Sequence, residues 1–308
     1  MKQLLPFAFV VPSLLTACIE PPQDLGDTQT SEANGALINA PLDTEHNFDV
    51  GVCANGQRAD GTCAGGRCSG TLIASNVVLT SRHCVIGIDY AEQFCDSTFS
   101  GPLSTATTLV TTSDTLRSGT PKWYEVERTL FPAGNNLCAD DIAIMILKNR
   151  VPPREARPVR IDYSFDYAKH QPDEVAVVGR GAIEQTLSTS NNGGGFRRVL
   201  EHIPFVCATN RGTCAVVDYS SPPSNLFISP ASFFVIGASI AAGDSGAGVF
   251  DQDTFNRNSR AVIGVASAGT FGADSNTNYG LVSRLDMHKT FIKNAMRQAG
   301  SGRGRDDN

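Results

Sequence analysis

The pattern of short apolar runs is the feature that most constrains the fold of this chain. Between about residues 37 and 299, runs rich in β-branched and aromatic residues alternate with clusters of Gly, Pro, Asn and Ser; examples are Thr71–Thr80, Ile142–Leu147, Glu174–Val178 and Ala261–Ala266. Such runs, bounded by turn residues, are typical of β-strands. The sequence therefore predicts an all-β sandwich or barrel. One helix is expected over Asp286–Ala299, where apolar residues fall on one face, with Gly300 as its stop.

The start of the chain indicates export. Lys2 is followed by an apolar run, Leu4–Ala17, that is too short to cross a bilayer as a mature helix, so residues 1–17 are interpreted as a signal peptide. Leu15-Thr16-Ala17-Cys18 also resembles the bacterial lipobox, in which a lipid is attached to the cysteine and the chain is cut before it. The alternative is an ordinary signal peptide with an incidental cysteine. Either reading predicts a protein of the cell envelope or the exterior.

Composition divides the rest of the chain and excludes one class of partner. Residues 18–36 are polar and poor in large apolar side chains, which predicts a flexible tether or propeptide, and residues 300–308 are expected to be a disordered tail. The intervening residues 37–299 form the expected folded domain. A net charge of -6 gives no basic field for nucleic-acid phosphates. The only membrane contact expected is a lipid anchor at Cys18.

The cysteines fit an oxidising compartment. The chain has nine, and setting Cys18 aside leaves eight, enough for four disulfides. Proximity in the sequence favours the pairs Cys53–Cys63, Cys68–Cys84, Cys95–Cys138 and Cys207–Cys214, although eight cysteines allow 105 connectivities. A zinc set of Cys63, Cys68, His83 and Cys84 is the alternative. It is disfavoured because closely spaced Cys-x2-4-Cys pairs are absent from the sequence.

Three separated segments carry candidate catalytic groups. Gly243-Asp244-Ser245-Gly246 places a serine in a tight turn, where the amides of Gly243 and Ser245 can point at one spot. His83 follows a strand-like run beside a cysteine, and Asp141 directly precedes an apolar strand. Taken singly, these are also a hairpin turn, a surface histidine and a solvated acid. Together they supply a nucleophile, a base and a group that orients the base.

In combination these segments resemble the trypsin and chymotrypsin family. Cys68-Ser-Gly-Thr-Leu-Ile and Val-Leu-Thr-Ser-Arg-His83-Cys84 are similar to its Cys-Gly-Gly-Ser-Leu-Ile and Val-Thr-Ala-Ala-His-Cys. Asp141-Ile-Ala-Ile resembles its Asp-Ile-Ala-Leu, which selects Asp141 over Asp140. Further similarities are Gly179-Arg180-Gly181 to Gly-Trp-Gly, Ser267-Ala268-Gly269 to Ser-Trp-Gly, and Tyr279–Arg284 to the last strand. The order His, Asp, Ser is also the family's order.

The resemblance implies a fold and a mechanism. The fold would be two six-stranded antiparallel β-barrels with a C-terminal helix and the active site between the barrels. Ser245 would attack the scissile carbonyl, His83 would accept its proton, and Asp141 would orient His83. The amides of Gly243 and Ser245 would form the oxyanion hole. Polypeptides would be the substrates, and no cofactor or metal is implied.

The family pattern is incomplete around the specificity pocket. Ala241 occupies the position of the family's cysteine four residues before the serine, and no partner cysteine follows Gly269. The pocket floor would be Ser239, with further substrate-binding positions at Ser267, Gly269 and Gly280. An uncharged floor predicts an apolar or aromatic residue on the acyl side of the cut.

The resemblance also implies activation by cleavage. Leu37-Ile38-Asn39-Ala40 resembles the family's new N-terminus, whose α-amino group would pair with Asp244. Ala36, not Arg or Lys, precedes it, so self-activation by tryptic cleavage is not supported. Cleavage there would also cut the tether and release the domain from the membrane.

Two other functions remain open on the sequence alone. A non-catalytic member of the same fold would act as a binding lipoprotein on the cell surface, although such relatives typically lose a triad residue. An esterase would use the same three groups on a different substrate.

Overall fold

The computed structural model describes residues 40–102, 105–117, 121–182, 194–209, 213–218, 225–238, 240–257, 259–270 and 278–301. Internal contacts divide the chain into residues 1–32 and residues 33–308, and every described residue belongs to the second unit. Cys18, Leu37 and Ser239 lie outside the described residues.

The first half of the domain forms a closed six-stranded barrel in the order β1-β2-β3-β8-β7-β6. Every pairing in it is antiparallel. Its strands are β1 (Asp49–Cys53), β2 (Arg67–Ala74), β3 (Val77–Thr80), β6 (Leu109–Thr111), β7 (Trp123–Leu130) and β8 (Ala143–Leu147). The predicted run Thr71–Thr80 is therefore two strands, because the chain turns at Ser75 and Asn76.

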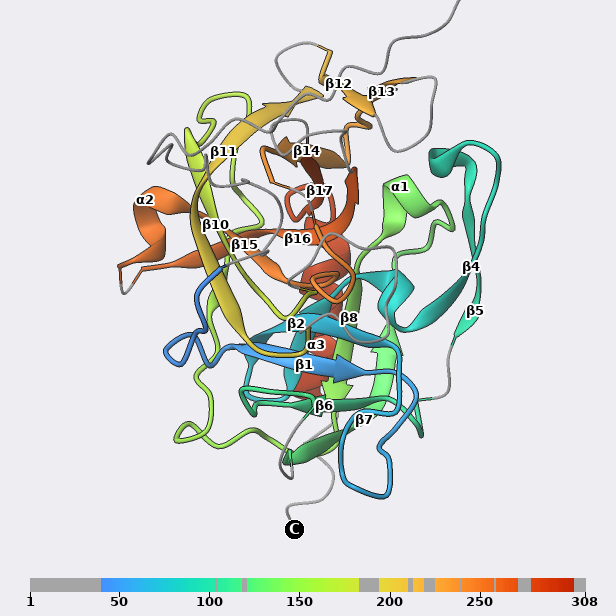
Figure 1. Cartoon of the computed structure of the whole chain (residues 1–308), viewed down its shortest axis with the longest axis vertical. Helices are drawn as coiled ribbons and strands as arrows, with labels where there is room; N and C mark the ends of the chain where they lie inside the picture. The colour runs from blue at the N-terminus through green and yellow to red at the C-terminus, as the bar shows by residue number, and fades with distance from the viewer. Residues whose placement is uncertain are drawn as a thin grey trace, which may run out of the picture. The chain divides into compact units, whose positions relative to one another are not determined.

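The second half forms another closed ring, β15-β10-β11-β14-β17-β16, which the β15–β16 pairing completes. Its strands are β10 (Glu174–Gly179), β11 (Arg198–Ala208), β14 (Phe233–Ile236), β15 (Gly248–Asp251), β16 (Ala261–Thr270) and β17 (Tyr279–Arg284). The short β9 (Arg160–Ile161) adds a parallel pairing to the outside of β16. In Figure 1 the strands β1, β6 and β7 lie in the lower half of the view and β14 and β17 in the upper half. The predicted pair of six-stranded barrels is confirmed.

The alternation of side chains along β3 and β8 explains how the two barrels join. Successive residues of a strand point to opposite faces, and here both faces are buried. Val78 and Met145 point into the first barrel's own core. Val77, Leu79, Ile144 and Ile146 point outward and pack with residues of the second barrel such as Val178, Phe250 and Val265. The interface between the barrels is thus a continuous apolar core.

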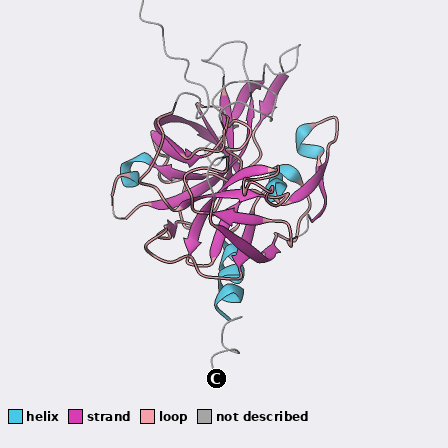
Figure 2. Ribbon diagram, turned by 60° about the horizontal axis from the view of Figure 1, so that its bottom comes forward, coloured by secondary structure: helices cyan, strands magenta, loops and turns pink. Residues whose placement is uncertain are grey.

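The helices and minor hairpins lie outside the two barrels (Figure 2). They are α1 (Leu137–Asp140), α2 (Gln252–Phe255), α3 (Lys289–Ser301), the 3-10 turns Arg82–Cys84 and Phe94–Asp96, and the hairpins β4–β5 (Ile86–Asp89 with Thr98–Pro102) and β12–β13 (Ala215–Asp218 with Asn225–Ile228). The C-terminal helix α3 packs Ile292 and Ala295 against the core between the barrels. Gly300 lies inside α3, so the predicted stop at Gly300 is wrong. The helix begins at Lys289, three residues after the predicted Asp286, and ends at Ser301, two residues after the predicted Ala299. Glycine tolerates helical dihedral angles, so this extension costs little at a helix end.

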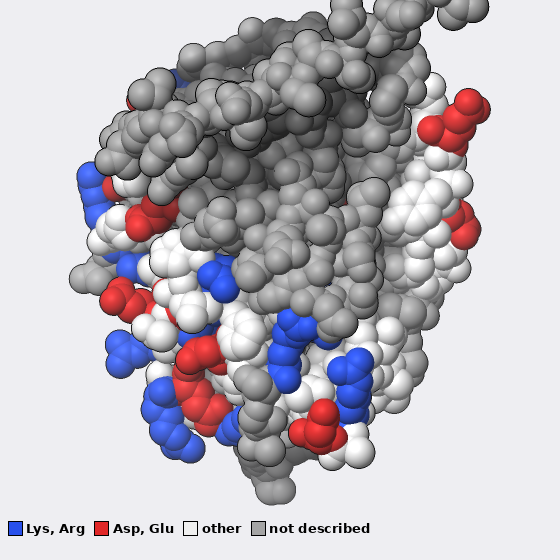
Figure 3. Space-filling view, viewed as in Figure 1, with Lys and Arg blue, Asp and Glu red and all other residues white. Residues whose placement is uncertain are grey.

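Four disulfides join the described cysteines: Cys53–Cys63, Cys68–Cys84, Cys95–Cys138 and Cys207–Cys214. These are the pairs that sequence proximity favours. Such a set is typical of extracellular proteins. In the described part of the chain, no helix has the length and hydrophobicity needed to cross a bilayer. On the described surface in Figure 3, basic and acidic side chains are interspersed.

Candidate active site

Asp141 and His83 form a buried pair that spans 58 residues of sequence. The His83 Nδ1 atom lies 2.8 Å from Asp141 Oδ2, and the His83 backbone N–H donates to Asp141 Oδ1 at 2.9 Å. The Asp141 side chain is fully buried, whereas the His83 side chain is 20% exposed. A carboxylate in this position fixes the tautomer with a proton on Nδ1 and leaves Nε2 as the acceptor.

The electrostatics of this pair favour an ionised acid beside a basic imidazole. Burial acts to raise the pKa of Asp141, but the charge of His83 and hydrogen bonds from His83 and Ser267 outweigh it, so the pKa is lowered. Burial acts to lower the pKa of His83, but the charge and hydrogen bond of Asp141 raise it above the usual 6.5. His83 is therefore a stronger base than a free imidazole.

The residues on either side of His83 hold it between the barrels. Ser81 Oγ donates to the Ala266 carbonyl of β16 at 2.7 Å. The buried Arg82 donates to the Gly134 carbonyl at 2.7 Å, and its guanidinium lies over the Phe99 ring, 4.2 Å from the centroid. The 3-10 turn that carries His83 is consequently fixed to both barrels.

The short helix α1, which precedes Asp141, determines the position of the Asp141 side chain. Asn136 caps α1 by accepting from the Ala139 N–H, and Asp140 accepts from the Asn136 N–H at 3.1 Å. The chain then leaves the helix at Asp141, whose carboxylate turns toward His83. The two adjacent acids therefore have different partners.

Ser267 contributes a contact that sequence reasoning missed. Its hydroxyl donates to Asp141 Oδ2 at 2.5 Å in a fully buried contact. The sequence assigned Ser267 only to substrate binding. The available signal was that Ser267 is a short polar residue in the middle of an apolar strand. Its partner Asp141 could not be identified in this way, because it lies 126 residues away in the sequence.

Ser245 lies beside this pair but is not bonded to His83. Its hydroxyl lies 3.5 Å from the Ser267 carbonyl oxygen, and the described residues show no hydrogen bond from Ser245 to the His83 ring. The disulfide sulfur of Cys84 lies 3.5 Å from the Ser245 carbonyl oxygen and within 4.8 Å of a His83 ring nitrogen, so Ser245 and His83 both lie close to this disulfide. Catalytic hydrogen bonds are often long without substrate and tighten when it binds.

The turn around Ser245 needs glycine on both sides. Gly243 and Gly246 have φ angles of 103° and 88°, in the left-handed region. A Cβ atom on Gly246 would lie 2.1 Å from the Ser69 carbonyl oxygen. Within the turn, Asp244 N–H and Gly246 N–H donate to Ala241 and Ala266. No described atom accepts from the N–H of Gly243 or Ser245, so these two amides are available to an oxyanion.

Asp244 is a second buried carboxylate, and its charge is poorly compensated. Its two oxygens accept from Gly181 N–H at 2.6 Å and Ala241 N–H at 3.2 Å. Burial, opposed by these bonds, raises its pKa to about 7. No described cation forms an ion pair with it. Leu37, the predicted source of such a cation, lies outside the described residues.

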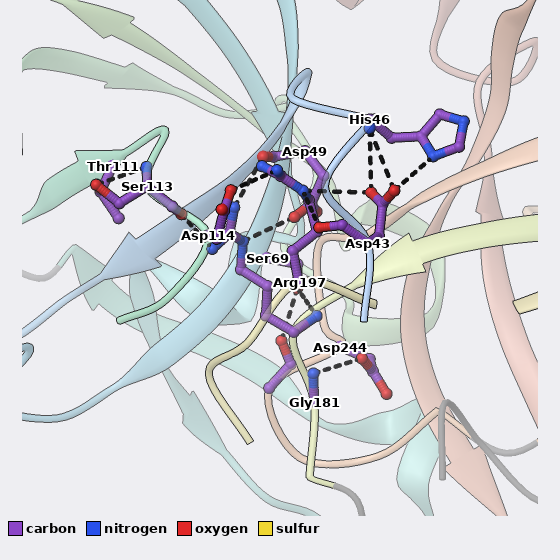
Figure 4. A network of polar contacts seen from close by, with 12 residues as sticks. Asp43, His46, Asp49, Ser69, Thr111, Ser113, Asp114, Gly181, Arg197 and Asp244 are labelled. Carbon is purple, nitrogen blue, oxygen red and sulfur yellow. Dashed lines mark hydrogen bonds and ion pairs between the residues drawn. The ribbon is translucent and has the colours of Figure 1, made fainter. Parts of the chain in front are cut away.

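Ser69 links the turn of residues 243–246, which would hold the oxyanion and is called the oxyanion turn below, to both barrels. Its hydroxyl donates to the Gly243 carbonyl at 2.8 Å and accepts from Arg180 N–H at 2.9 Å, while its N–H donates to the Ser245 carbonyl at 2.8 Å. The Arg180 side chain is buried and pairs with Asp49 of β1 at 2.7 Å. Figure 4 shows Ser69 between Asp49 and the Gly181–Asp244 contact.

Arg197 anchors the start of the domain in the same network. It contacts Asp43 at 3.2 Å and Asp114 at 2.6 Å, and Asp43 also contacts His46 at 3.0 Å (Figure 4). The nearby Arg198 donates to the carbonyl of the buried Ala40 at 2.5 Å. The described chain therefore begins beside the second barrel, three residues after Leu37.

The predicted substrate-binding residues lie on β16 and β17. Gly269 pairs with Gly280 across these strands. A side chain on Gly280 would meet the Ala238 carbonyl and the side chains of Ile236 and Ile240. This region is therefore apolar and narrow.

The zinc alternative fails on the state of its ligands. Cys68, His83 and Cys84 place potential ligand atoms within 4.8 Å of one another. The sulfurs of Cys68 and Cys84 are joined in a disulfide, and Cys63 is paired with Cys53. These sulfurs are not thiolates, the form that binds zinc.

The two closed six-stranded barrels and the C-terminal helix define a chymotrypsin-like fold. The family model described as Trypsin matches residues 46–292, so the chain belongs to the trypsin family. No curated protein matches the chain.

Proposed function

We propose that this protein is an exported serine endopeptidase in which Ser245, His83 and Asp141 act as nucleophile, base and orienting acid. The observation that carries the proposal is the buried Asp141–His83 pair beside a turn with two available amides. A binding protein of the same fold has no need of an imidazole fixed with Nε2 as acceptor.

The mechanism follows from this arrangement. On substrate binding, Ser245 Oγ turns from the Ser267 carbonyl toward His83 Nε2 and gives up its proton as it attacks the carbonyl carbon. The amides of Gly243 and Ser245 stabilise the oxyanion, and each such donor lowers the barrier by roughly 2.7 to 4 kcal/mol in enzymes of this kind. His83 then delivers the proton to the leaving amine, and water hydrolyses the acyl-enzyme by the reverse sequence.

A fluorophosphonate probe tests the nucleophile directly. Labelling of the mature protein at Ser245, and its loss in Ser245→Ala, are expected; Ser164→Ala removes an exposed hydroxyl that bonds Asp162, and it serves as the matched control that still labels. Absence of labelling supports the binding-protein alternative. Casein and a simple ester assayed in parallel separate an endopeptidase from an esterase.

Activity should depend on the protonation of His83. Since the charge and hydrogen bond of Asp141 raise the pKa of His83 above 6.5, kcat/KM should fall as the pH drops through that pKa, because a protonated imidazole cannot accept the serine proton. A profile that stays flat down to about pH 5 contradicts the mechanism.

The acyl-side preference is proposed to be apolar. Gly269, Gly280 and the flanking Ile236 and Ile240 support this preference, because they offer no charge to a substrate side chain. Peptide-library profiling on the acyl side tests it, and a preference for Arg or Lys would exclude it.

Export and activation complete the proposal. The protein is anchored through a lipid on Cys18 until cleavage after Ala36 frees the Leu37 amino group, which pairs with Asp244 and releases the domain. The raised pKa of Asp244, about 7, supports this step because the buried carboxylate lacks a described cation. Mass spectrometry of the native active form tests it, and an active form beginning at lipidated Cys18 would exclude it.

A further inference from the structure

A cavity of about 650 Å³ opens beside the oxyanion turn. Ala242 and Gly243 form one wall, and residues 58–67 with Leu116 and Arg117 form others. Ser267, Gly269 and Gly280 do not line it. Ser245 contacts β16 through its hydroxyl and Ser69 through its carbonyl, and the cavity lies on the Ser69 side. If the acyl part of a substrate follows β16, this cavity faces the part that leaves.

The loop of residues 53–67, which forms one wall of the cavity, is held in place by a disulfide and several hydrogen bonds. The Cys53–Cys63 disulfide closes it, and backbone bonds join Ala54 to Gly66 and Ala64 to Gly56. Trp123 Nε1 donates to the Gly61 carbonyl at 2.9 Å. The loop therefore presents its side chains from a fixed backbone, which reduces the entropy lost on binding.

Cations predominate among the described charged residues that line the cavity. These residues are Arg58, Arg67 and Arg117, with Asp60 as the one acid among them. Arg180 also reaches the wall but is paired with Asp49. Burial, and then the positive charges of Arg117 and Arg58, lower the pKa of Arg67, in keeping with the three residues lining one cavity. On the face drawn in Figure 3, the described basic and acidic side chains are interspersed.

The opposite wall is glycine backbone that lies close to one arginine. Gly194 and Gly195 line the cavity, and a Cβ atom on Gly195 would lie 2.8 Å from Arg117 Cγ, so the absence of a side chain there lets the stem of Arg117 pack against this wall. A concave site with clustered guanidinium groups is suited to a carboxylate, which can accept two parallel hydrogen bonds from one arginine.

We propose that this cavity binds an acidic side chain of the substrate just after the scissile bond, giving the enzyme a preference for Asp or Glu within the first three leaving-group positions. The inference rests on the proposed endopeptidase function. An extended peptide advances about 3.3 Å per residue, so residues that follow the cut pass directly from the oxyanion turn to the cavity.

Matched peptides test the preference. Internally quenched peptides would share one acyl side and carry Glu, Gln or Lys at each of the three positions after the cut. The Glu peptide should be cleaved with a kcat/KM about tenfold above its Gln counterpart at the best position, and the Lys peptide more slowly than both. The Glu-to-Gln ratio should shrink in 1 M salt, because a partly exposed charge interaction is screened.

Variants locate the site. Arg67→Gln and Arg117→Gln should each reduce the Glu-to-Gln ratio severalfold, with active sites counted by fluorophosphonate titration so that misfolded protein does not enter the rates. Arg150→Gln makes the same charge change at an exposed residue that does not line the cavity, and it should keep the wild-type ratio. Equal cleavage of Glu and Gln peptides by the wild type, or an unchanged ratio in both cavity variants, overturns the inference alone. Failure to cleave every peptide or to label Ser245 overturns the proposed function as well.

Discussion

The two buried carboxylates flanking the candidate nucleophile have opposite environments. Asp141 accepts from His83 twice and from Ser267, and its pKa is lowered. Asp244 accepts from two backbone amides, and its pKa is raised to about 7. A buried charge is costly unless a partner compensates it. The described fold gives the charge of Asp141 such partners, whereas the described contacts of the Asp244 carboxylate are two backbone amides; the proposed activation would add a cation there.

The largest effect is expected from removing the charge of Asp141. In Asp141→Asn, the amide would orient His83 in the wrong tautomer, so that Nε2 carries a proton and cannot accept one from Ser245. We expect kcat to fall by about 10⁴, as it does for the same substitution in other Ser-His-Asp triads. Steady-state kinetics on a peptide measure it. Asp140→Asn alters the neighbouring acid, whose carboxylate accepts from the Asn136 N–H, and it should keep kcat within about twofold of the wild type; equal losses in both variants would contradict the assignment.

The sequence identified Asp141 as the candidate acid but did not predict the contacts that surround it. A carboxylate before an apolar strand, within a family motif, identified the residue, since that information is local. The Ser267 hydroxyl on Asp141 and the pairing of Arg180 with Asp49 join residues 126 and 131 positions apart. Only the closure of both barrels brings these groups together.

The secondary-structure elements show the same contrast between local sequence patterns, which could be predicted, and contacts between distant segments, which could not. The runs of β8 and β10 were recognised because both faces are apolar, and the cysteine pairs because most are close in sequence. The parallel addition of β9 to β16 involves two residues without a distinctive pattern. The cavity beside Gly243 likewise depends on loops from both barrels meeting, which no single segment encodes.

Asp244 should matter less than Asp141 for activity. Asp244→Asn removes the counter-charge for the proposed new N-terminus, so the amides of Gly243 and Ser245 would be held less well. A loss of about 10² in kcat/KM is expected, comparable to losing one oxyanion donor. The measurement uses the cleaved protein at pH 8. Full activity in this variant would show that the oxyanion turn forms without the ion pair.

Stability should respond in the opposite sense at the two acids. Because the folded pKa of Asp244, about 7, lies above the usual 3.8, ionising it in the native state costs stability as the pH rises from 4 to 7. In uncleaved protein carrying Ser245→Ala, Asp244→Asn should therefore stabilise the fold at pH 8, by at most on the order of 4 kcal/mol, and have little effect at pH 4. Asp141→Asn in the same background should destabilise at pH 8, because the lowered pKa of Asp141 contributes stability above 3.8 that is lost on acidification.

Calorimetry of the two variants at both pH values compares these effects directly. Two variants that shift the melting temperature in the same direction at pH 8 would contradict the contrast between the acids.

The smallest effect is expected at Ser69, which supports the turn between the two acids. Ser69→Ala leaves the Gly243 carbonyl and the Arg180 N–H without the hydroxyl that joins them. An unsatisfied buried polar group costs about 1–3 kcal/mol, and part of that cost should appear as misplacement of the Gly243 amide. We expect kcat to fall about tenfold with KM nearly unchanged, because the amide contacts the oxyanion and not the ground-state substrate. Ser69→Thr keeps the hydroxyl and should recover most of kcat. A change confined to thermal stability, with kcat unaltered, would assign Ser69 to folding rather than to the oxyanion hole.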